Sequence, residues 1–379
     1  MKWYRKILLL TLFTIPFRLT AQDSLKLSGQ LSAWGNFNPS GDISLWFEGR
    51  YIPQLDYSIK LPGNKLIDFE LSANLSAMAG MHPSDTISAS AQIKAYRVWM
   101  RYSGSNFELR LGLQKINFGS ATILRPLMWF DQLDPRDPLQ LTDGVWALLG
   151  RYYFLNNANL WLWGLYGNNR PRGLEPTGTS RDYPEFGGRL QYPVPKGEIA
   201  LSYHHRIADT RGTILSIPAF PKVPENRIGI DGKWDLGIGL WFEGSWTGKG
   251  KDLGKYTNSE LVNIGSDYTF GIGNGLNLVV EQLIVAYDEK AFSFSNAASF
   301  TGLSLSYPAG TFDYMTGILF YDWASNSIYN FINWRHQLDR ISLYLMAYWN
   351  PEKYALPQLG SNSTLFAGKG IQIMFTYNY

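Results

Sequence analysis

The chain has no cysteine in its 379 residues, which excludes disulfide bonds, thiolate metal sites and a cysteine nucleophile. After the first two dozen residues it has no apolar run of about 18 residues, so transmembrane helices are not expected there. Charge is sparse and balanced, with 17% charged residues and a net charge of +3, and composition therefore suggests no nucleic-acid partner. The four histidines have none of the spacings that zinc sites use, and no enzyme is expected.

The N-terminus has the composition of an export signal. Six residues that include Lys2, Arg5 and Lys6 precede an apolar run over 7–19, which leads to Thr20-Ala21-Gln22. This pattern predicts a signal peptide over 1–21 and a mature single domain over 22–379. A membrane anchor is disfavoured because the apolar run is short and is interrupted by proline and arginine.

The last ten residues alternate apolar and polar side chains to the end of the sequence. Ile371, Ile373, Phe375, Tyr377 and Tyr379 share one parity, while Gln372, Thr376 and Asn378 share the other. Only a closed sheet satisfies every backbone group in lipid, and its strands must alternate in this way. Aromatic residues make up 15% of the chain, as expected for interfacial girdles. The sequence therefore predicts an all-β fold, a transmembrane antiparallel β-barrel.

Strand-length segments alternate with tight turns and with longer connections. The tight turns are expected at 61–64, 103–106, 155–158, 195–197, 235–237, 273–275, 308–310 and 337–339, and the longer loops at about 38–42, 79–87, 119–143, 168–184, 209–225, 248–259, 288–297, 323–327 and 350–367. Glycine, asparagine and proline in the first set favour hairpin turns. We expect about 18 strands, with 16 as the lower alternative, and both termini in the periplasm. A multidomain β-sandwich is less favoured because its outward face would be polar.

Charged side chains occupy the parity that would face the lumen. The expected pore-lining residues of the strands are Arg97, Arg101, Arg110, Arg151 and Arg189 on one wall, and Glu243 and Glu281, with Asp267 and Asp313, on another. A packed apolar core could not hold so many ions. Two interpretations stay open: the two walls create a transverse field across a wet pore, or the charges form local pairs that hold the interior together.

The 119–143 segment is the longest expected loop, and it mixes apolar with charged residues. Long loops of this kind are commonly functional. We expect it to fold inward and narrow the pore, with Arg125, Asp131, Asp134, Arg136 and Asp137 at the constriction; packing over the rim is an equal alternative. The acidic run lacks the oxygen spacing of a calcium loop, so neither a metal nor a cofactor is expected.

A family resemblance rests on the segment Leu111–Gly119, followed by Pro126 and by Asp134-Pro135-Arg136-Asp137-Pro138. It resembles the pattern LGxQ-x-x-x-(W/F)-G … P … D-P of porin-like barrels related to alginate-export proteins, and the Ala-Gln cleavage site resembles those of Bacteroidota. The resemblance implies a porin-like barrel in the bacterial outer membrane. We therefore expect a channel for passive diffusion of small hydrophilic solutes.

Other interpretations stay open. The barrel could be non-conducting and serve as a structural or assembly partner in an outer-membrane complex, or it could carry apolar molecules. Trp161 and Trp163 beside Leu160 and Leu162 make one strand apolar on both faces, which indicates contact with a plug, a neighbour or a second copy. The expected partners are membrane lipid and lipopolysaccharide, small polar solutes, and a second copy or another outer-membrane protein.

Overall fold

The computed structural model describes residues 24–41, 43–81, 87–213, 215–352 and 363–379. The expected signal peptide over 1–21 lies outside the described residues. The elements are β1 (Ser24–Phe37), β2 (Leu45–Leu61), β3 (Lys65–Met81), β4 (Ile87–Ser103), β5 (Phe107–Gln114), β6 (Val145–Tyr153), β7 (Asn159–Leu165), β8 (Gly178–Thr179), β9 (Glu185–Val194), β10 (Gly197–Asp209), β11 (Val223–Asp235), β12 (Gly239–Lys249), β13 (Asn258–Phe270), β14 (Leu276–Asp288), β15 (Ala297–Pro308), β16 (Asp313–Asp322), β17 (Ser327–Gln337), β18 (Ile341–Trp349), the 3₁₀ helix η1 (Ser363–Phe366) and β19 (Lys369–Asn378).

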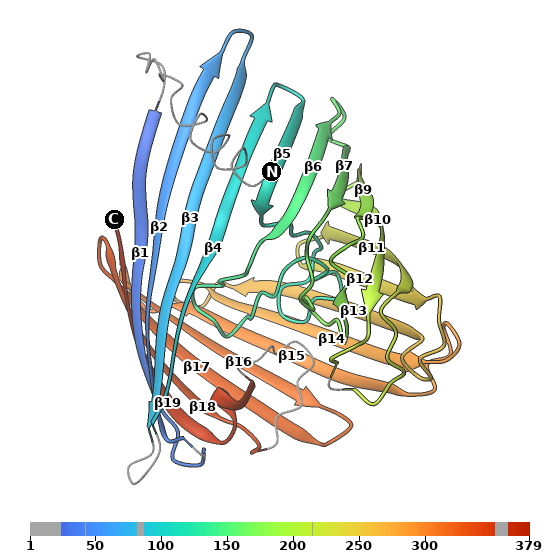
Figure 1. The fold of residues 1–379 in the computed structure, drawn as a ribbon. Helices are drawn as coiled ribbons and strands as arrows, with labels where there is room; N and C mark the ends of the chain where they lie inside the picture. Colours follow the sequence, from blue (N-terminus) through green and yellow to red (C-terminus); the bar gives the residue numbers. More distant parts are fainter. Residues whose placement is uncertain (1–23, 42, 82–86, 214, 353–362) are drawn as a thin grey trace, which may run out of the picture.

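These strands form one closed antiparallel barrel (Figure 1). Each long strand pairs with its neighbours in sequence, and β1 pairs with β19 to close the ring. The two-residue β8 only extends the edge of β10, so 18 of the 19 strands make the barrel wall. The prediction of an all-β barrel of about 18 strands is confirmed.

The closing seam runs to the last residue of the chain. β1 and β19 pair from Gln30 opposite Asn378 to Phe37 opposite Ile371. Beyond that ladder, Gly29 and Tyr379 exchange two backbone hydrogen bonds, of 3.2 and 3.1 Å. The Tyr379 hydroxyl also lies 2.6 Å from that of Tyr51 on β2. The terminal alternation therefore fixes the register in which the barrel closes.

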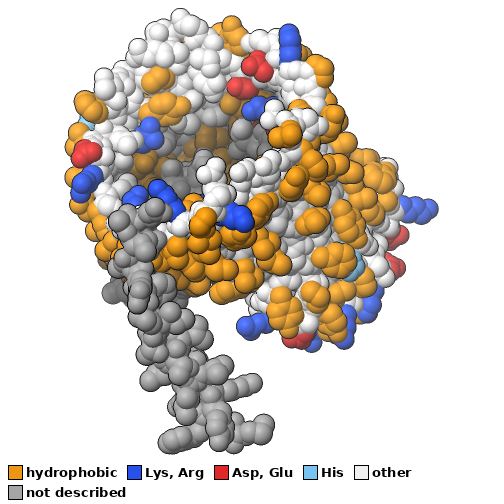
Figure 2. Space-filling view, turned by 90° about the horizontal axis from the view of Figure 1, so that it is seen from above, with side chains coloured by type: hydrophobic (Ala, Val, Ile, Leu, Met, Phe, Trp, Pro, Cys, Tyr) orange, Lys and Arg blue, Asp and Glu red, His pale blue; other side chains and the backbone are white. Residues whose placement is uncertain are grey.

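The outer surface is apolar and the inner surface is polar where the strands follow the period of two. On β19, Ile373 and Phe375 are 55% and 40% exposed, whereas Gln372 and Thr376 are 6% and 1% exposed. The flank of the barrel in Figure 2 shows a nearly continuous cover of hydrophobic side chains. Within the described residues no helix is long and apolar enough to cross a membrane.

Connection length alternates around the ring as expected. The eight connections from β2–β3 to β17–β18 on one edge are tight turns of two to five residues, and the other edge holds all of the long connections, although β16–β17 there spans only 323–326. The beginning of β1 and the end of β19 both lie at the tight-turn edge. The longest described connection, 115–144 between β5 and β6, begins four residues earlier than the expected loop, because β5 ends at Gln114.

An arginine substitution on the outer face tests whether this apolar face contacts lipid. Ile230 on β11 points outward and is 49% exposed, and Ile230→Arg should cost about 2–4 kcal/mol of unfolding free energy if it lies near the bilayer midplane. The measurement is a denaturant titration in lipid vesicles, with Ile230→Leu as the matched control. A loss of only about 0.5 kcal/mol, typical of a water-exposed surface site, would contradict burial of this face in lipid.

Candidate functional site

The connection between β5 and β6, residues 115–144, lies inside the barrel; we call it the lumen loop. Figure 1 shows it running through the interior in front of β13 to β15. Its apolar side chains are buried there: Ile116, Phe118, Leu124, Leu127, Trp129 and Phe130 are all at most 6% exposed. In a loop that faces solvent such apolar side chains would be exposed to water, so this segment is a packed part of the interior.

One carboxylate on the far wall accepts three of the loop's backbone N–H groups. Glu281 on β14 is fully buried. Its two oxygens accept hydrogen bonds from the backbone N–H groups of Thr122 (2.7 Å), Ile123 (3.1 Å) and Leu124 (2.5 Å). The Thr122 hydroxyl and the Asn263 amide add bonds of 3.1 and 3.3 Å. A backbone N–H left unpaired in this dry site would be costly, so Glu281 fixes the loop's turn in place.

Glu243 on β12 holds the next part of the loop in the same way. It is also fully buried, and it accepts hydrogen bonds from the backbone N–H groups of Ala121 at 2.6 Å and Leu127 at 3.2 Å. Ser245, two residues along β12, accepts a bond of 3.0 Å from the Trp129 indole. The two glutamates expected on an acidic pore wall therefore bind the lumen loop.

Two apolar clusters anchor the loop to opposite sides of the barrel. In one, Phe118 and Phe130 pack with inward residues of β6 and β7, and Phe118 stacks on Trp163 at 5.7 Å between centroids. In the other, Ile123 and Leu124 pack with inward residues of β13 to β18. The strand with two apolar faces, β7, thus contacts the lumen loop, one of the partners expected from its sequence.

The charged residues expected at a constriction are mostly paired within the loop. Arg125 lies 3.3 Å from Asp131 and also donates to the Phe118 carbonyl. Arg136 pairs with Asp134 at 2.6 Å, and its guanidinium lies 5.1 and 4.7 Å from the ring centroids of Phe331 and Phe366.

The fifth of these residues, Asp137, caps a turn. Its carboxylate accepts hydrogen bonds from the backbone N–H groups of Leu139 (2.9 Å) and Leu141 (3.1 Å). Burial raises the pKa of this carboxyl and also that of Asp131. These groups stabilise the folded loop.

The expected basic wall has two kinds of arginine. Arg101 on β4, Arg110 on β5 and Arg151 on β6 surround Glu108 at 3.6, 3.0 and 3.5 Å, and their side chains are 29%, 16% and 17% exposed. Arg101 also pairs with Asp68 at 2.7 Å. These three guanidinium groups therefore lie at an inner surface that water reaches.

The other two arginines of that wall are buried. Arg97, 7% exposed, donates to the carbonyl of Thr142 in the lumen loop at 2.9 Å. Arg189, 4% exposed, binds Asp231 in bidentate fashion at 2.5 and 2.8 Å. Asp313 differs from expectation: Phe320 on the same strand packs inward, so Asp313 has the outward parity, where it bonds to Trp334 and His336.

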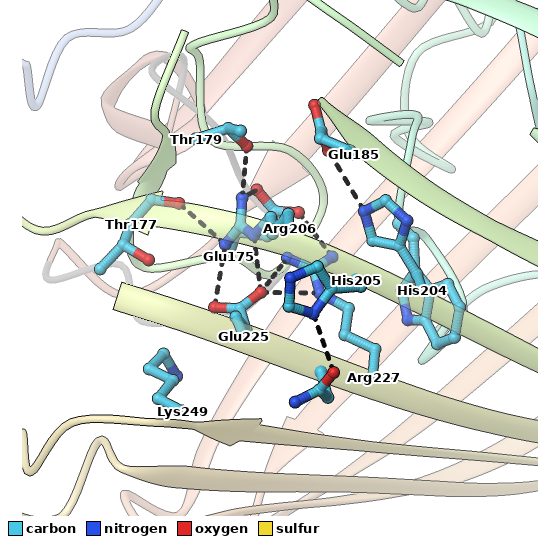
Figure 3. A network of polar contacts seen from close by, with 12 residues as sticks. Glu175, Thr177, Thr179, Glu185, His204, His205, Arg206, Glu225, Arg227 and Lys249 are labelled. Atoms are coloured by element: carbon cyan, nitrogen blue, oxygen red, sulfur yellow. Dashed lines mark hydrogen bonds and ion pairs between the residues drawn. The ribbon is translucent and has the colours of Figure 1, made fainter. Parts of the chain in front are cut away.

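Sequence reasoning missed a second inner loop, residues 166–184, between β7 and β9. Its Glu175 reaches Arg206 on β10 at 2.8 Å and Arg227 on β11 at 2.6 Å. Both arginines also bind Glu225, each with a closest contact of 2.6 Å (Figure 3). No local signal could have found this loop, because Glu175 lies 31 residues from Arg206 in the sequence.

Together the loops divide the lumen into two unlike parts. Along β6 to β18 they pack against the wall and exclude water, whereas charged side chains on β2 to β6 stay partly exposed. Viewed from the tight-turn edge, the barrel is visibly hollow, with basic and acidic side chains around the opening (Figure 2). The space beside the partly exposed charged side chains of β2 to β6 can hold small polar or charged solutes. Holding such solutes requires no reactive group.

Solved structures with a similar fold include bacterial porins. OccAB1 of Acinetobacter baumannii superposes with a TM-score of 0.58 at 8% identity, covering 95% of this chain and 97% of that one. The anion-selective porin of Comamonas acidovorans gives 0.51 at 12%, covering 94% and 100%. Salmonella typhi OmpF, in complex with daunomycin, gives 0.52 at 8%, covering 94% and 98%. Such identities establish the porin-type barrel fold alone.

No family model and no curated protein matches the sequence. The resemblance to the alginate-export group and the Bacteroidota origin therefore stay predictions.

Removal of one carboxylate charge should release the lumen loop. A hydrogen bond to a charged group contributes about 1.5–3 kcal/mol, so in Glu281→Gln the amides of Thr122, Ile123 and Leu124 should exchange with deuterium at least about tenfold faster. Hydrogen exchange read by mass spectrometry on the purified barrel measures this. The control is Glu198→Gln, which changes an exposed carboxylate near the beginning of β10. Equal protection of the three amides from exchange in both variants would contradict the anchoring role.

Proposed function

We propose that the protein is a bacterial outer-membrane channel for the passive diffusion of small hydrophilic solutes. The porin-type fold and the apolar exterior support the location. The tight turns and both termini would lie in the periplasm, and the longer loops outside the cell. The observation that carries the proposal is the charged inner wall of β2 to β6, where Arg50, Arg101, Arg110 and Arg151 keep 16–29% of their side-chain surface exposed.

The solute path follows this wall. Arg50 beside Glu48, the Arg101–Asp68 pair and the group around Glu108 line it. Trp99 and Trp161 lie under Arg110 and Arg151, with the guanidinium carbons 4.7 and 3.8 Å from the ring centroids. Stacked and paired side chains of this kind are held still, so they form a fixed polar surface along which hydrated solutes pass.

The lumen loop narrows this path. It occupies the space between β6 and β18, so diffusion is confined to the remaining side. Selection then depends on the width left beside the loop and on the charge of the wall. No turnover and no cofactor take part in this mechanism.

Planar-bilayer recording tests both the channel and its narrowing. We compare the wild type with a variant in which 121–141 is replaced by a short Gly-Ser linker. Steady wild-type currents and a larger single-channel conductance in the variant are the expected result, because the replacement removes Ile123, Leu124, Leu127, Trp129 and Phe130 from the interior. The point variant Glu281→Gln, which leaves the chain length unchanged, should show more frequent wide openings.

Silence from all three proteins, each shown to be folded by its heat-modifiable mobility in gel electrophoresis, would overturn the channel. It would favour the alternative of a non-conducting barrel in an outer-membrane complex. Unchanged conductance after loop replacement would instead retain the channel and remove the constriction.

Ion selectivity tests the position of the path. With Arg101, Arg110 and Arg151 all changed to alanine, the reversal potential in a salt gradient should move toward that of a cation-selective pore, since fixed charge sets local ion concentrations. Glu108→Ala should move it the opposite way. Identical reversal potentials in the wild type and both variants would show that ions do not pass along this wall.

A further inference from the structure

A small buried cavity of about 40 Å³ lies behind the lumen loop. The lumen loop, the second inner loop and the inner faces of β10 to β13 enclose it. About 10–15 Å³ of such space is enough for one water molecule, so the cavity fits a single small guest or a few waters. Neither the anchoring of the loop nor the proposed channel uses it.

Cationic side chains outnumber carboxylates in the cavity wall. Arg206, Arg227 and Lys249 face it together with Glu175 and Glu225. All five side chains are at most 8% exposed. Buried charge without a counter-charge is unfavourable by several kcal/mol. The wall therefore carries one positive charge more than its own carboxylates neutralise.

The two carboxylates are already engaged by the arginines. Glu225 accepts hydrogen bonds from Arg206 at 2.6 and 3.2 Å and from Arg227 at 2.9 and 2.6 Å. Glu175 binds the same two guanidinium groups and the backbone N–H of Arg172. These contacts leave Lys249 as the cation without a carboxylate partner in the wall.

Lys249, on β12, has one hydrogen bond, to the carbonyl of Tyr256 at 3.0 Å. Among the residues that the structure describes it forms no salt bridge. Figure 3 shows its side chain beside the network, with no contact drawn to Glu225. An ammonium group has three donors, so two remain for a guest of the cavity.

Hydroxyl groups complete the donor set. Ser245, Thr247 and Ser259 line the same cavity. The Ser245 oxygen accepts the Trp129 indole N–H, and its own hydroxyl hydrogen is left to donate. Trp129, Met128 and Leu261 supply an apolar side. The cavity thus presents donors and excess positive charge to a small guest.

We propose that this cavity binds one monovalent inorganic anion, a halide such as chloride. A halide accepts hydrogen bonds from the ammonium and hydroxyl groups and neutralises the charge that the carboxylates leave. A halide is also small enough for a cavity of about 40 Å³. Its role is to stabilise the contact between the second inner loop and the barrel wall.

A route for the ion leads from the outer end of the barrel. A cleft of about 460 Å³ between the β12–β13 and β14–β15 connections is lined by Lys249, Lys251 and Lys290, with Asp252 and Glu289. Lys249 therefore borders both the open cleft and the buried cavity. An anion drawn to the cleft by its lysines would meet the same ammonium group that faces the cavity.

Anomalous diffraction from crystals of the full-length mature barrel grown in sodium bromide provides the direct test. A bromide peak within hydrogen-bond distance of Lys249 Nζ and the Ser259 hydroxyl is expected. Lys249→Met should lose this peak, whereas Lys251→Met, which changes only the outer cleft, should retain it. A cavity that holds water alone in bromide, or a peak that survives Lys249→Met, would overturn the proposal.

A solution measurement keeps the test valid if Lys249→Met does not fold. The unfolding rate in detergent is compared in sodium chloride and in sodium gluconate at equal ionic strength, because a ligand that binds only the folded state stabilises it. Chloride should slow wild-type unfolding severalfold, with a smaller effect in the double variant Thr247→Val, Ser259→Ala. Equal rates in the two salts would overturn the site, while an equal chloride effect in wild type and double variant would place binding elsewhere.

Discussion

The need to satisfy backbone N–H groups that are shut away from water determines how this barrel is filled. A loop that crosses the lumen carries donors that no strand can pair, and here five of them bond to the carboxylates of Glu243 and Glu281. Each carboxylate offers several acceptor positions. The two side chains from β12 and β14 can therefore accept the five hydrogen bonds that a neighbouring strand would otherwise accept. The apolar side chains of the loop can then pack against the wall without leaving orphaned polar groups.

The asymmetry of the lumen follows from that arrangement. Once the loop is fixed to β12 and β14, its aromatic residues pack against β6 and β7 on one flank, and Ile123 and Leu124 pack against β13 to β18 on the other. The inward positions of those strands are accordingly large and apolar, such as Trp163, Leu283 and Phe331. Strands β2 to β5 have no such cover, and their inward positions hold charged residues in pairs, as Asp68 with Arg101 does.

The parts of this structure that local chemistry determines could be predicted. Alternation at period two and turn residues specify strands and hairpins within about ten residues of chain, which is why about 18 strands and the outward parity of Tyr379 could be expected. The partners of Glu243 and Glu281 could not, because they lie more than a hundred residues away. The parity of Asp313 failed for a related reason: Ile318 and Phe320 face inward while Leu319 and Tyr321 face outward, so the strand shows no alternation to read.

That failure itself carries information about lumen-filled barrels. A strand whose inner face meets water must alternate, and a strand whose inner face meets a packed loop need not. β7, with Trp161 and Trp163 between leucines, and β16 are of the second kind, whereas β2 and β4, with arginines inside, are of the first. The loss of alternation in β7 and β16 therefore marks strands that the packed loops cover, whereas β10 and β11 are also covered and keep their alternation because their inner faces hold buried charged residues. The same reasoning explains why the buried ions occur where both inner loops meet the wall, since charges there can be balanced only by partners held as rigidly as they are.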